Sequence, residues 1–476
     1  MDKTLLEERK KTLFRQQTSA WHSLSDETKA ARDLSEEYKV YLDEGKNERF
    51  FIEKAESDAR KAGFVPFEEA GELKGGSKIF FTNRKKNLLL AVIGKDGVNK
   101  GFSLCASHVD APRLDVKPNP LNEDGDSSTA YLKTHYYGGV KKYHWVQIPL
   151  ALTGVVILKD GTVKKVDIGN DPADPVFTIP DILIHLSGKI QADKKMPEII
   201  TGEQLNVLLA HQPVDDPELK DGIKLAALEF LNEKYGMTEE DFLSAELEVV
   251  PAANARDLGL DRSMILAHGQ DDRVCGFANL KALFDLKETP ERTCVAFLAD
   301  KEEVGSRGST GMDSHFFYHC LSKIAHGVTE NYSEILFRDI LNNSHALSTD
   351  VAAAVDYNFK SVHDMGNAAK MGRGVNINKY TGARGKAGSN DADAEYLAAL
   401  RQLLDEHNVP WQISELGKVD EGGGGTVAFL LSRYGIHTID MGTPVMGMHA
   451  PLEITSKIDV YATYKACRVF YESFRG

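Results

Sequence analysis

The first recognisable elements of the chain are short apolar runs bounded by glycine and charged residues. Residues 87–93, 102–107 and 294–299 are runs of this kind, and residues 436–440 form a shorter one. Such runs are typical of strands that are buried on both faces. We therefore expect four strands that lie in a covered sheet.

Between and after these runs, apolar residues recur at helical spacing. Val274 to Leu286 has this spacing, and so do residues 391–406 and 455–474. Ser389 or Asn390 would cap the second of these helices. Alternating strands and helices predict an α/β fold in which a mostly parallel sheet is flanked by helices.

The pattern changes in the middle of the chain, where residues 117–255 are rich in short β patterns, proline and aspartate. Residues 148–158 and 162–166 are joined through an Asp-Gly turn, which is a strong hairpin signal. We predict a discontinuous catalytic α/β domain, residues 1–116 and 256–476, that is interrupted by an inserted, mainly β domain.

Composition limits the possible partners and location. A chain of 476 residues predicts two domains, and a net charge of −14 argues against nucleic acid or an anionic membrane surface as the main partner. Its 5 cysteines are scattered, the N-terminus is charged and no long apolar run follows it. We therefore expect a cytoplasmic protein without a disulfide framework or a membrane span.

Metal-binding types of side chain recur where the predicted strands end. Each has an ordinary structural alternative: the acids as helix caps or surface turns, the histidines as loop residues. Their number and their common setting favour a two-metal hydrolase, in which one carboxylate holds an ion while its neighbour handles protons. The set consists of His108, Asp271, Glu302, Glu303, Asp350 and His449.

A pair of metal ions about 3.5–4 Å apart requires a bridging carboxylate, two further ligands for each ion and an unligated base. The set above has this number of groups, and Asp271, supported by Asp272, suits the bridging place. Asp110 lies two residues after His108 on the same strand face, where it can bond the far imidazole nitrogen.

Other motifs are absent or ambiguous in the sequence. There is no HExxH helix, GxSxG nucleophile turn, or GxGxxG or Walker nucleotide pattern. The glycine tract 421–426 either offers backbone amides to a substrate, through Gly423 and Gly424, or is a flexible turn.

Five motifs occur in an order that resembles one known family. This order is similar to that of the aspartyl aminopeptidase and aminopeptidase I family of dinuclear zinc exopeptidases, and the resemblance covers nearly the whole chain. The motifs lie at residues 106–113, 270–274, 300–306, 348–350 and 447–449.

The resemblance implies a role for each position. His108, Asp271 and Asp350 would hold one ion, and Asp271, Glu303 and His449 the other. Glu302 would be the general base that takes a proton from the attacking water and passes it to the leaving amine. The ions would be Zn²⁺, although such ligands also accept Mn²⁺ or Co²⁺.

The resemblance also implies a homododecamer built from dimers, in which the inserted domain makes dimer contacts. His185 matches a family histidine that reaches a neighbouring subunit's site as an oxyanion donor; the alternative is a packed strand histidine. Acid-selective members carry a lysine where this chain has Asn376. Lys379 would have to substitute for it, so the preferred N-terminal residue is acidic or neutral.

The leading interpretation is a metal-dependent aminopeptidase that removes the N-terminal residue from short peptides. One alternative is a dizinc dipeptidase or an N-acyl amino acid deacylase on the same scaffold. Another is a non-catalytic assembly protein that has kept the fold.

Overall fold

The apolar runs form strands of one large sheet. The computed structural model describes residues 3–476, and in that part of the chain the sheet has nine strands in the order β1-β2-β3-β13-β4-β14-β20-β16-β18. The four predicted strands are confirmed as β3 (Asn87–Val92), β4 (Phe102–His108), β13 (Thr293–Ala299) and β20 (His437–Gly442). The others are β1 (Val65–Pro66), β2 (Lys78–Asn83), β14 (His345–Thr349), β16 (Val375–Asn378) and β18 (Trp411–Ile413).

The sheet is mixed, whereas the sequence predicted a mostly parallel one. Its centre, β13-β4-β14-β20, is parallel, but β3 runs antiparallel to β13 and β16 runs antiparallel to β20. β2 is likewise antiparallel to β3, because only a short turn separates these two strands and such a connection permits only an antiparallel pair.

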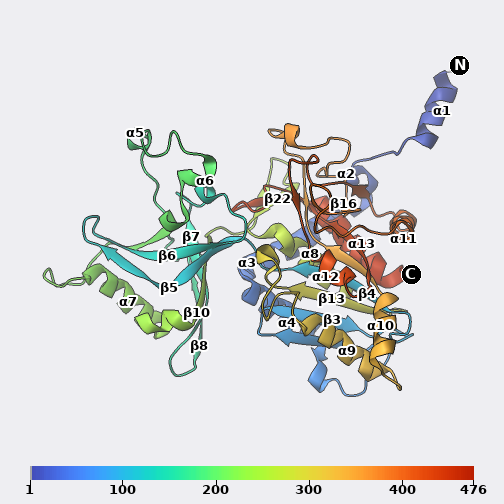
Figure 1. Cartoon of the computed structure of the whole chain (residues 1–476), viewed down its shortest axis with the longest axis horizontal. Coiled ribbons are helices and arrows are strands. Elements are labelled where there is room, and N and C mark those ends of the chain that lie inside the picture. The colour runs from blue at the N-terminus through green and yellow to red at the C-terminus, as the bar shows by residue number, and fades with distance from the viewer. Residues whose placement is uncertain (1–2) are drawn as a thin grey trace.

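Helices cover both faces of the large sheet (Figure 1). Along β3, Leu88 and Leu90 face one buried cluster while Leu89 faces the other, as the twofold repeat of a strand requires. The first face is packed by α3 (Thr28–Glu44), α4 (Glu48–Lys61), α8 (Gln270–Phe284), α11 (Ala394–Glu406) and α13 (Lys457–Ser473). The second is packed by α9 (Phe316–Val328), α10 (Glu334–Asn342) and α12 (Ala428–Ser432).

The three predicted helices are confirmed as α8, α11 and α13, with one error at a boundary. The side chain of Asp393 accepts a hydrogen bond from the Tyr396 amide and caps α11. Neither Ser389 nor Asn390 is the cap, because Asp391, which follows them, still forms an antiparallel β-bridge with Tyr380. The helix therefore begins at Ala394.

A second lobe contains a separate antiparallel sheet (Figure 1, left). Its buried cluster includes Trp145, Leu152 and Val249, and the predicted hairpin is confirmed as β7 paired with β8. The strands, in the order β8-β7-β10-β5-β6-β9, are β5 (Arg113–Asp124), β6 (Thr129–Tyr137), β7 (Leu150–Ile157), β8 (Val163–Ile168), β9 (Asn206–Ala210) and β10 (Ala245–Pro251). Its helices include α5 (Ile184–Ser187), α6 (Met196–Ile199) and α7 (Gly222–Tyr235). That residues 117–255 act as an inserted domain stays a prediction.

The remaining elements form two smaller sheets and the N-terminal helices. A third sheet contains β11 (Arg256–Leu258), β12 (Met264–Ala267), β22 (Glu453–Ser456), β21 (Pro444–Met446) and β15 (Ala352–Ala353). The pair β17 (Gly382–Ala383) and β19 (Gly423–Gly424) lies apart from it. At the N-terminal end, α1 (Lys3–Leu13) stands away from the body of the molecule and α2 (Ala20–Ser23) packs on it (Figure 1).

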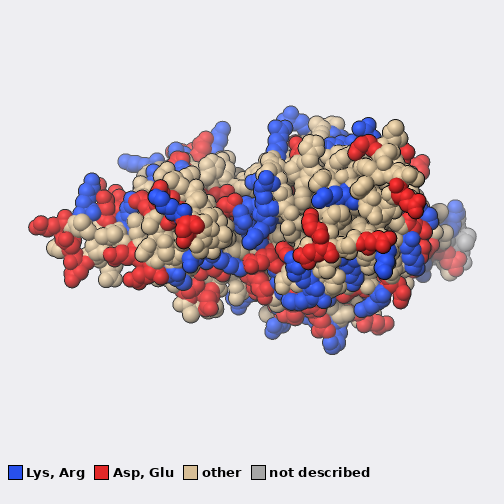
Figure 2. All heavy atoms as spheres, turned by 90° about the horizontal axis from the view of Figure 1, so that it is seen from below, with Lys and Arg blue, Asp and Glu red and all other residues tan. Residues whose placement is uncertain are grey.

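The surface charge is distributed over both lobes. Figure 2 shows acidic and basic side chains interspersed across the face in view. Among residues 3–476, no helix combines the length and the apolar character needed to cross a membrane. All five cysteines are buried and unpaired.

Candidate metal centre

Three neighbouring parallel strands bring their final residues to one edge of the large sheet. His108 is the last residue of β4, and its register partner on β13 is Ala299. Glu302 and Glu303 follow β13 in a single 3-10 turn, and Asp350 directly follows β14. Because parallel strands end at the same edge, side chains from distant parts of the sequence meet there.

Asp271 and His449 reach the same place from other elements. Asp271 lies in the first turn of the buried helix α8, and its peptide bond to Asp272 is cis. His449 lies in the loop between β21 and β22, with φ of +65°. Neither position follows from the large sheet alone.

The donor atoms form two groups that share one carboxylate. One group is His108, Asp271 and Asp350, the other is Asp271, Glu303 and His449, and within each group the atoms lie within 4.8 Å of one another. In the first, His108 Nε2 is 3.2 Å from Asp271 Oδ1 and 4.0 Å from Asp350 Oδ1. In the second, His449 Nε2 is 3.2 Å from Asp271 Oδ2 and 3.4 Å from Glu303 Oε2. The structure thus brings together all five predicted ligands.

Asp110 supports this arrangement through contacts with His108 and with the turn that carries Glu302 and Glu303. His108 Nδ1 lies 3.0 Å from the Asp110 carbonyl oxygen and 3.4 Å from Asp110 Oδ1, so the predicted contact to the far imidazole nitrogen is made mainly through the backbone. The carboxylate also accepts hydrogen bonds from the backbone amides of Glu302 at 3.1 Å and Glu303 at 3.2 Å. Asp110 therefore positions both the histidine and the two glutamates.

Glu453 plays the same part on the opposite side, and sequence reasoning missed it. Its carboxylate accepts hydrogen bonds from the backbone amides of His449 at 2.7 Å and Asp271 at 3.0 Å. Burial raises the pKa of Glu453 to about 8. The sequence feature that could have identified Glu453 is its position four residues after His449, at the start of a strand.

Burial and mutual charge dominate the electrostatics of the cluster. Burial, which the nearby imidazole of His108 only partly offsets, raises the pKa of Glu302 to about 7. Burial and the charge of Asp271 raise the pKa of Glu303 well above its ordinary range. Burial lowers the pKa of His449, but the carboxylates of Asp271 and Glu303 outweigh it and raise that pKa to about 10. A bound cation would neutralise this concentration of acidic groups.

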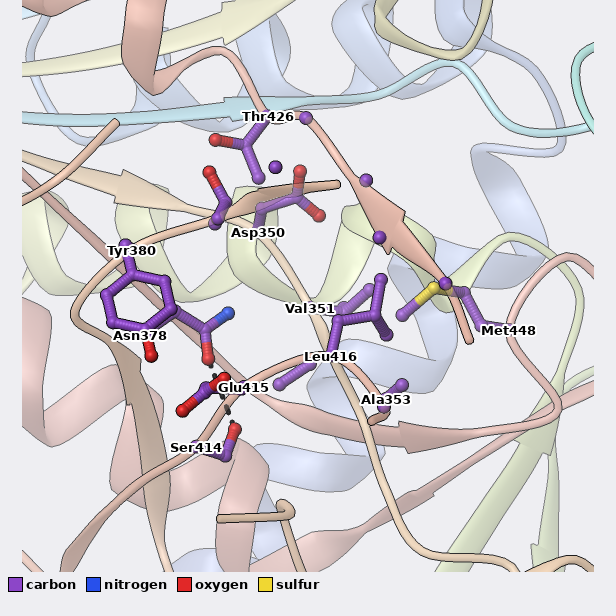
Figure 3. Close-up of a pocket in the computed structure, with 18 of the residues that line it drawn as sticks. Asp350, Val351, Ala353, Asn378, Tyr380, Ser414, Glu415, Leu416, Thr426 and Met448 are labelled. Atoms are coloured by element: carbon purple, nitrogen blue, oxygen red, sulfur yellow. Dashed lines mark hydrogen bonds between the residues drawn. The ribbon is translucent and has the colours of Figure 1, made fainter. Parts of the chain in front are cut away.

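The cluster lies at the base of a cavity of about 370 Å³. Gly423 and Gly424 line the cavity, as do Arg384, Lys386 and Lys418. Figure 3 shows one side formed by Val351, Ala353, Leu416 and Met448, and another by Asn378, Tyr380, Ser414 and Glu415. The volume falls in the range of small-molecule sites.

The comparisons with known proteins agree with one another. The family model described as aminopeptidase I zinc metalloprotease (M18) matches residues 41–471. The chain belongs to this M18 family. It is therefore a zinc metalloprotease with aminopeptidase function.

Relatives match the M18 chain over nearly its full length. A probable M18 family aminopeptidase 1 of Borrelia garinii subsp. bavariensis is 48% identical over 454 residues, which are 95% of this chain and 98% of the relative. A solved M18 aminopeptidase of Thermotoga maritima is 42% identical with a TM-score of 0.91, covering 96% of this chain and 100% of that one. A structure of the S. cerevisiae mApe1 dodecamer, 20% identical with a TM-score of 0.75 and covering 93% and 97%, shows a likeness of fold.

The zinc that the M18 family implies fits the residues that are present. Tetrahedral zinc with bonds of about 2.0–2.2 Å separates adjacent ligand atoms by about 3.3–3.6 Å. Three of the four contacts described above are close to that spacing, and Asp350 is slightly farther away. Asp271 Oδ1 and Glu303 Oε1 are buried without a hydrogen-bond partner, which is costly unless a cation is bound.

Two residues predicted to take part lie elsewhere in this M18 chain. Lys379 is not among the residues that line the cavity; its ammonium is 3.6 Å from Asp391. His185 is exposed on α5 in the second lobe, so the packed-strand alternative is wrong. Asn376 is fully buried and donates to Asn378.

Proposed function

We propose that this protein is a two-metal aminopeptidase that removes an acidic or neutral N-terminal residue from short peptides. His108, Asp271 and Asp350 would hold one ion, and Asp271, Glu303 and His449 would hold the other. The observation that supports this most strongly is the membership of Asp271 in both donor groups. Zn²⁺ is the expected ion, and the same ligands accept Mn²⁺ or Co²⁺.

The chemistry requires a base beside the ions. When bound, a pair of divalent ions would supply a water of lowered pKa and a Lewis acid for the scissile carbonyl. Glu302 is the base, because it faces the same cavity and belongs to neither donor group. Its carboxylate takes the proton of the attacking water and delivers it to the leaving amine. Asp110 fixes Glu302 through the backbone amide.

The cavity suits the first residue of a peptide. The free α-amine would lie beside the carboxylates, which limits cleavage to the terminal residue. The apolar wall of Val351, Leu416 and Met448 favours neutral side chains, whereas Arg384 provides a charge for acidic ones. Gly423 and Gly424 line the cavity and would offer backbone groups to the substrate. Lys379 would have to break its ion pair with Asp391 before it could bind an acidic substrate side chain.

We place a self-association surface on the second lobe, residues 117–255. Leu183, Ile184, Leu186 and Ile190 expose between 53% and 79% of their surface there, an unusual concentration of apolar side chains. His185 lies among them and would act as an oxyanion donor in a neighbouring subunit. The expected assembly is a homododecamer built from dimers. Buried, unpaired cysteines suit the cytoplasm, where we expect the protein to act.

The deciding experiment combines metal analysis with a substrate panel. The purified protein is assayed with aminoacyl reporters carrying Leu, Ala, Asp and Glu, with dipeptides, and with N-acyl amino acids. The proposal requires about two ions for each chain and turnover of substrates with a free amine. Hydrolysis of acylated substrates alone would instead identify a deacylase, and cleavage restricted to dipeptides a dipeptidase. Metal binding without any turnover would favour a non-catalytic assembly protein.

A further inference from the structure

We propose that the segment Tyr137–Gly139, which leaves strand β6 of the second lobe, positions His449 and the glutamate turn of the metal centre. The inference rests on the proposed function and extends it to a part of the chain that bears none of the proposed ligands. Two of its three residues hydrogen-bond to Asp110 and His449, and Gly138 between them lies close to Glu303, so the segment acts as one positioning element.

Tyr137 acts through Asp110. Its hydroxyl donates a hydrogen bond of 2.8 Å to Asp110 Oδ2, and both residues are buried, at 9% and 0% exposure. The same oxygen accepts the Glu303 amide, while Asp110 Oδ1 accepts the Glu302 amide. A third donor therefore fixes the carboxylate on which the two glutamates depend. Without it, the Asp110 carboxylate keeps the two backbone amides but loses the donor that fixes Oδ2 from the side of the second lobe.

Gly139 orients the second histidine. His449 Nδ1 lies 3.1 Å from the Gly139 carbonyl oxygen, which can only accept a hydrogen bond. Nδ1 therefore carries a proton, and Nε2, which faces Asp271 and Glu303, is the nitrogen left to bind a metal ion in exchange for its own proton. This orientation is the one that metal ligation through Nε2 requires.

Gly138 lets the segment approach closely. Its φ is +71°, a left-handed conformation that favours glycine, and a Cβ atom there would lie 3.3 Å from Glu303 Cβ and 3.5 Å from Glu303 Oε2. Any side chain at this position would press on a proposed ligand. The close approach and the two hydrogen bonds thus occur within three residues.

The segment is held in turn by a charge network that connects the two lobes. The guanidinium of Arg113 lies over the Tyr137 ring, 3.9 Å from its centroid. Arg113 also contacts Glu48 of α4 at 3.3 Å and Glu248 of β10 at 3.2 Å. Because these partners come from both lobes, the ring is fixed where the lobes meet. The geometry of the centre therefore depends on how the second lobe is attached.

The test is Tyr137→Phe, which removes only the hydroxyl, with Tyr136→Phe as its matched control. Tyr136 is the adjacent residue of the same strand and is 41% exposed. Loss of a residue that orients metal ligands without binding the metal itself typically lowers metal affinity or activity by about 10- to 100-fold. We expect that loss in kcat and in zinc affinity, measured by competition with a chelating dye, while KM and Tm stay at the wild-type values. A purely structural role would lower Tm first.

A second variant keeps the result decisive if Tyr137→Phe is unstable. Gly138→Ala leaves the tyrosine in place and should weaken zinc binding by pressing on Glu303. If Tyr137→Phe is stable, the inference is overturned when this variant matches Tyr136→Phe in kcat and zinc affinity. If Tyr137→Phe is unstable, Gly138→Ala decides, and wild-type zinc affinity in that variant overturns the inference. A wild-type protein that binds zinc but has no peptidase activity would overturn the proposed function. It would leave the present inference open to test, because the zinc affinities of the variants can still be compared.

Discussion

Asp271 and His108 meet through a contact of 3.2 Å between Oδ1 and Nε2, and the other oxygen of Asp271 lies equally close to His449 Nε2. One carboxylate thus faces a histidine on either side. This is the position that a bridging ligand would take, and it arises because a helix N-terminus points at the edge where three strands end.

Removing the shared carboxylate should affect both ions together. In Asp271→Asn one carboxylate oxygen becomes an NH2 group, which cannot bind a metal, and the other becomes a neutral amide oxygen, so one donor group loses a ligand and the other keeps only a weaker one. We expect metal content, measured by mass spectrometry after dialysis, to fall from about two ions for each chain toward none. In Glu303→Gln only one group is damaged, and one ion should remain. Equal metal loss in the two variants would argue against a bridging role for Asp271.

Glu302→Gln should separate metal binding from turnover. Glu302 belongs to neither donor group, so the variant should keep its metal, while loss of a general base lowers kcat by roughly 10²- to 10⁴-fold. Glu415→Gln is the control, because Glu415 lines the same cavity outside the metal cluster. A Glu302→Gln enzyme as active as Glu415→Gln would exclude this residue as the base.

The sequence named all five proposed ligands, three of them because strand ends can be recognised from apolar runs followed by acids or histidine. His108, Glu303 and Asp350 lie at such ends. It did not predict Glu453, Tyr137 or Gly139, since each acts by a hydrogen bond that depends on tertiary proximity. No local pattern distinguishes a carboxylate that accepts a backbone amide from one that faces solvent.

The errors in the fold have a similar origin. A run of apolar residues predicts a buried strand without its direction, so the antiparallel flanks of the large sheet were missed. The cap of α11 was placed early because Ser389, Asn390 and Asp393 are all residues that favour the cap position. The long separation of β5 from β10 in the sequence likewise leaves their pairing unpredictable.

Complementation tests whether His185 acts in a neighbouring subunit. His185→Ala should lose roughly 10²- to 10³-fold in kcat, the usual loss for one oxyanion donor, with zinc content unchanged. Mixing it with Glu302→Gln under conditions of subunit exchange should restore activity, because some sites then combine an intact Glu302 with an intact partner histidine. Lys189→Ala, an exposed change nearby, is the control. A mixture no more active than its components would place His185 outside the catalytic sites.

The stability of the fold should fall in mild acid partly because of His345. Burial, with the charges of Arg292 and His437, lowers the pKa of His345 from its ordinary 6.5 to about 4. As the pH falls from 6.5 toward 4, the unfolded chain takes up a proton that the folded chain does not, so stability is lost in that window.

His345→Gln should therefore lose less of its Tm than the wild type between neutral pH and about pH 4.5. Both proteins are measured by thermal unfolding after chelation, so that metal release does not contribute. His319→Gln, at an exposed position of α9, serves as the control and should follow the wild type. Parallel Tm curves for all three proteins would show that His345 does not contribute to the loss.

The most direct test of the two-metal centre is anomalous scattering at the zinc edge from crystals of the zinc-loaded protein. The account predicts two peaks about 3.5–4 Å apart, one among His108, Asp271 and Asp350 and the other among Asp271, Glu303 and His449. A single peak, or peaks that leave Asp271 bound to only one ion, would contradict it.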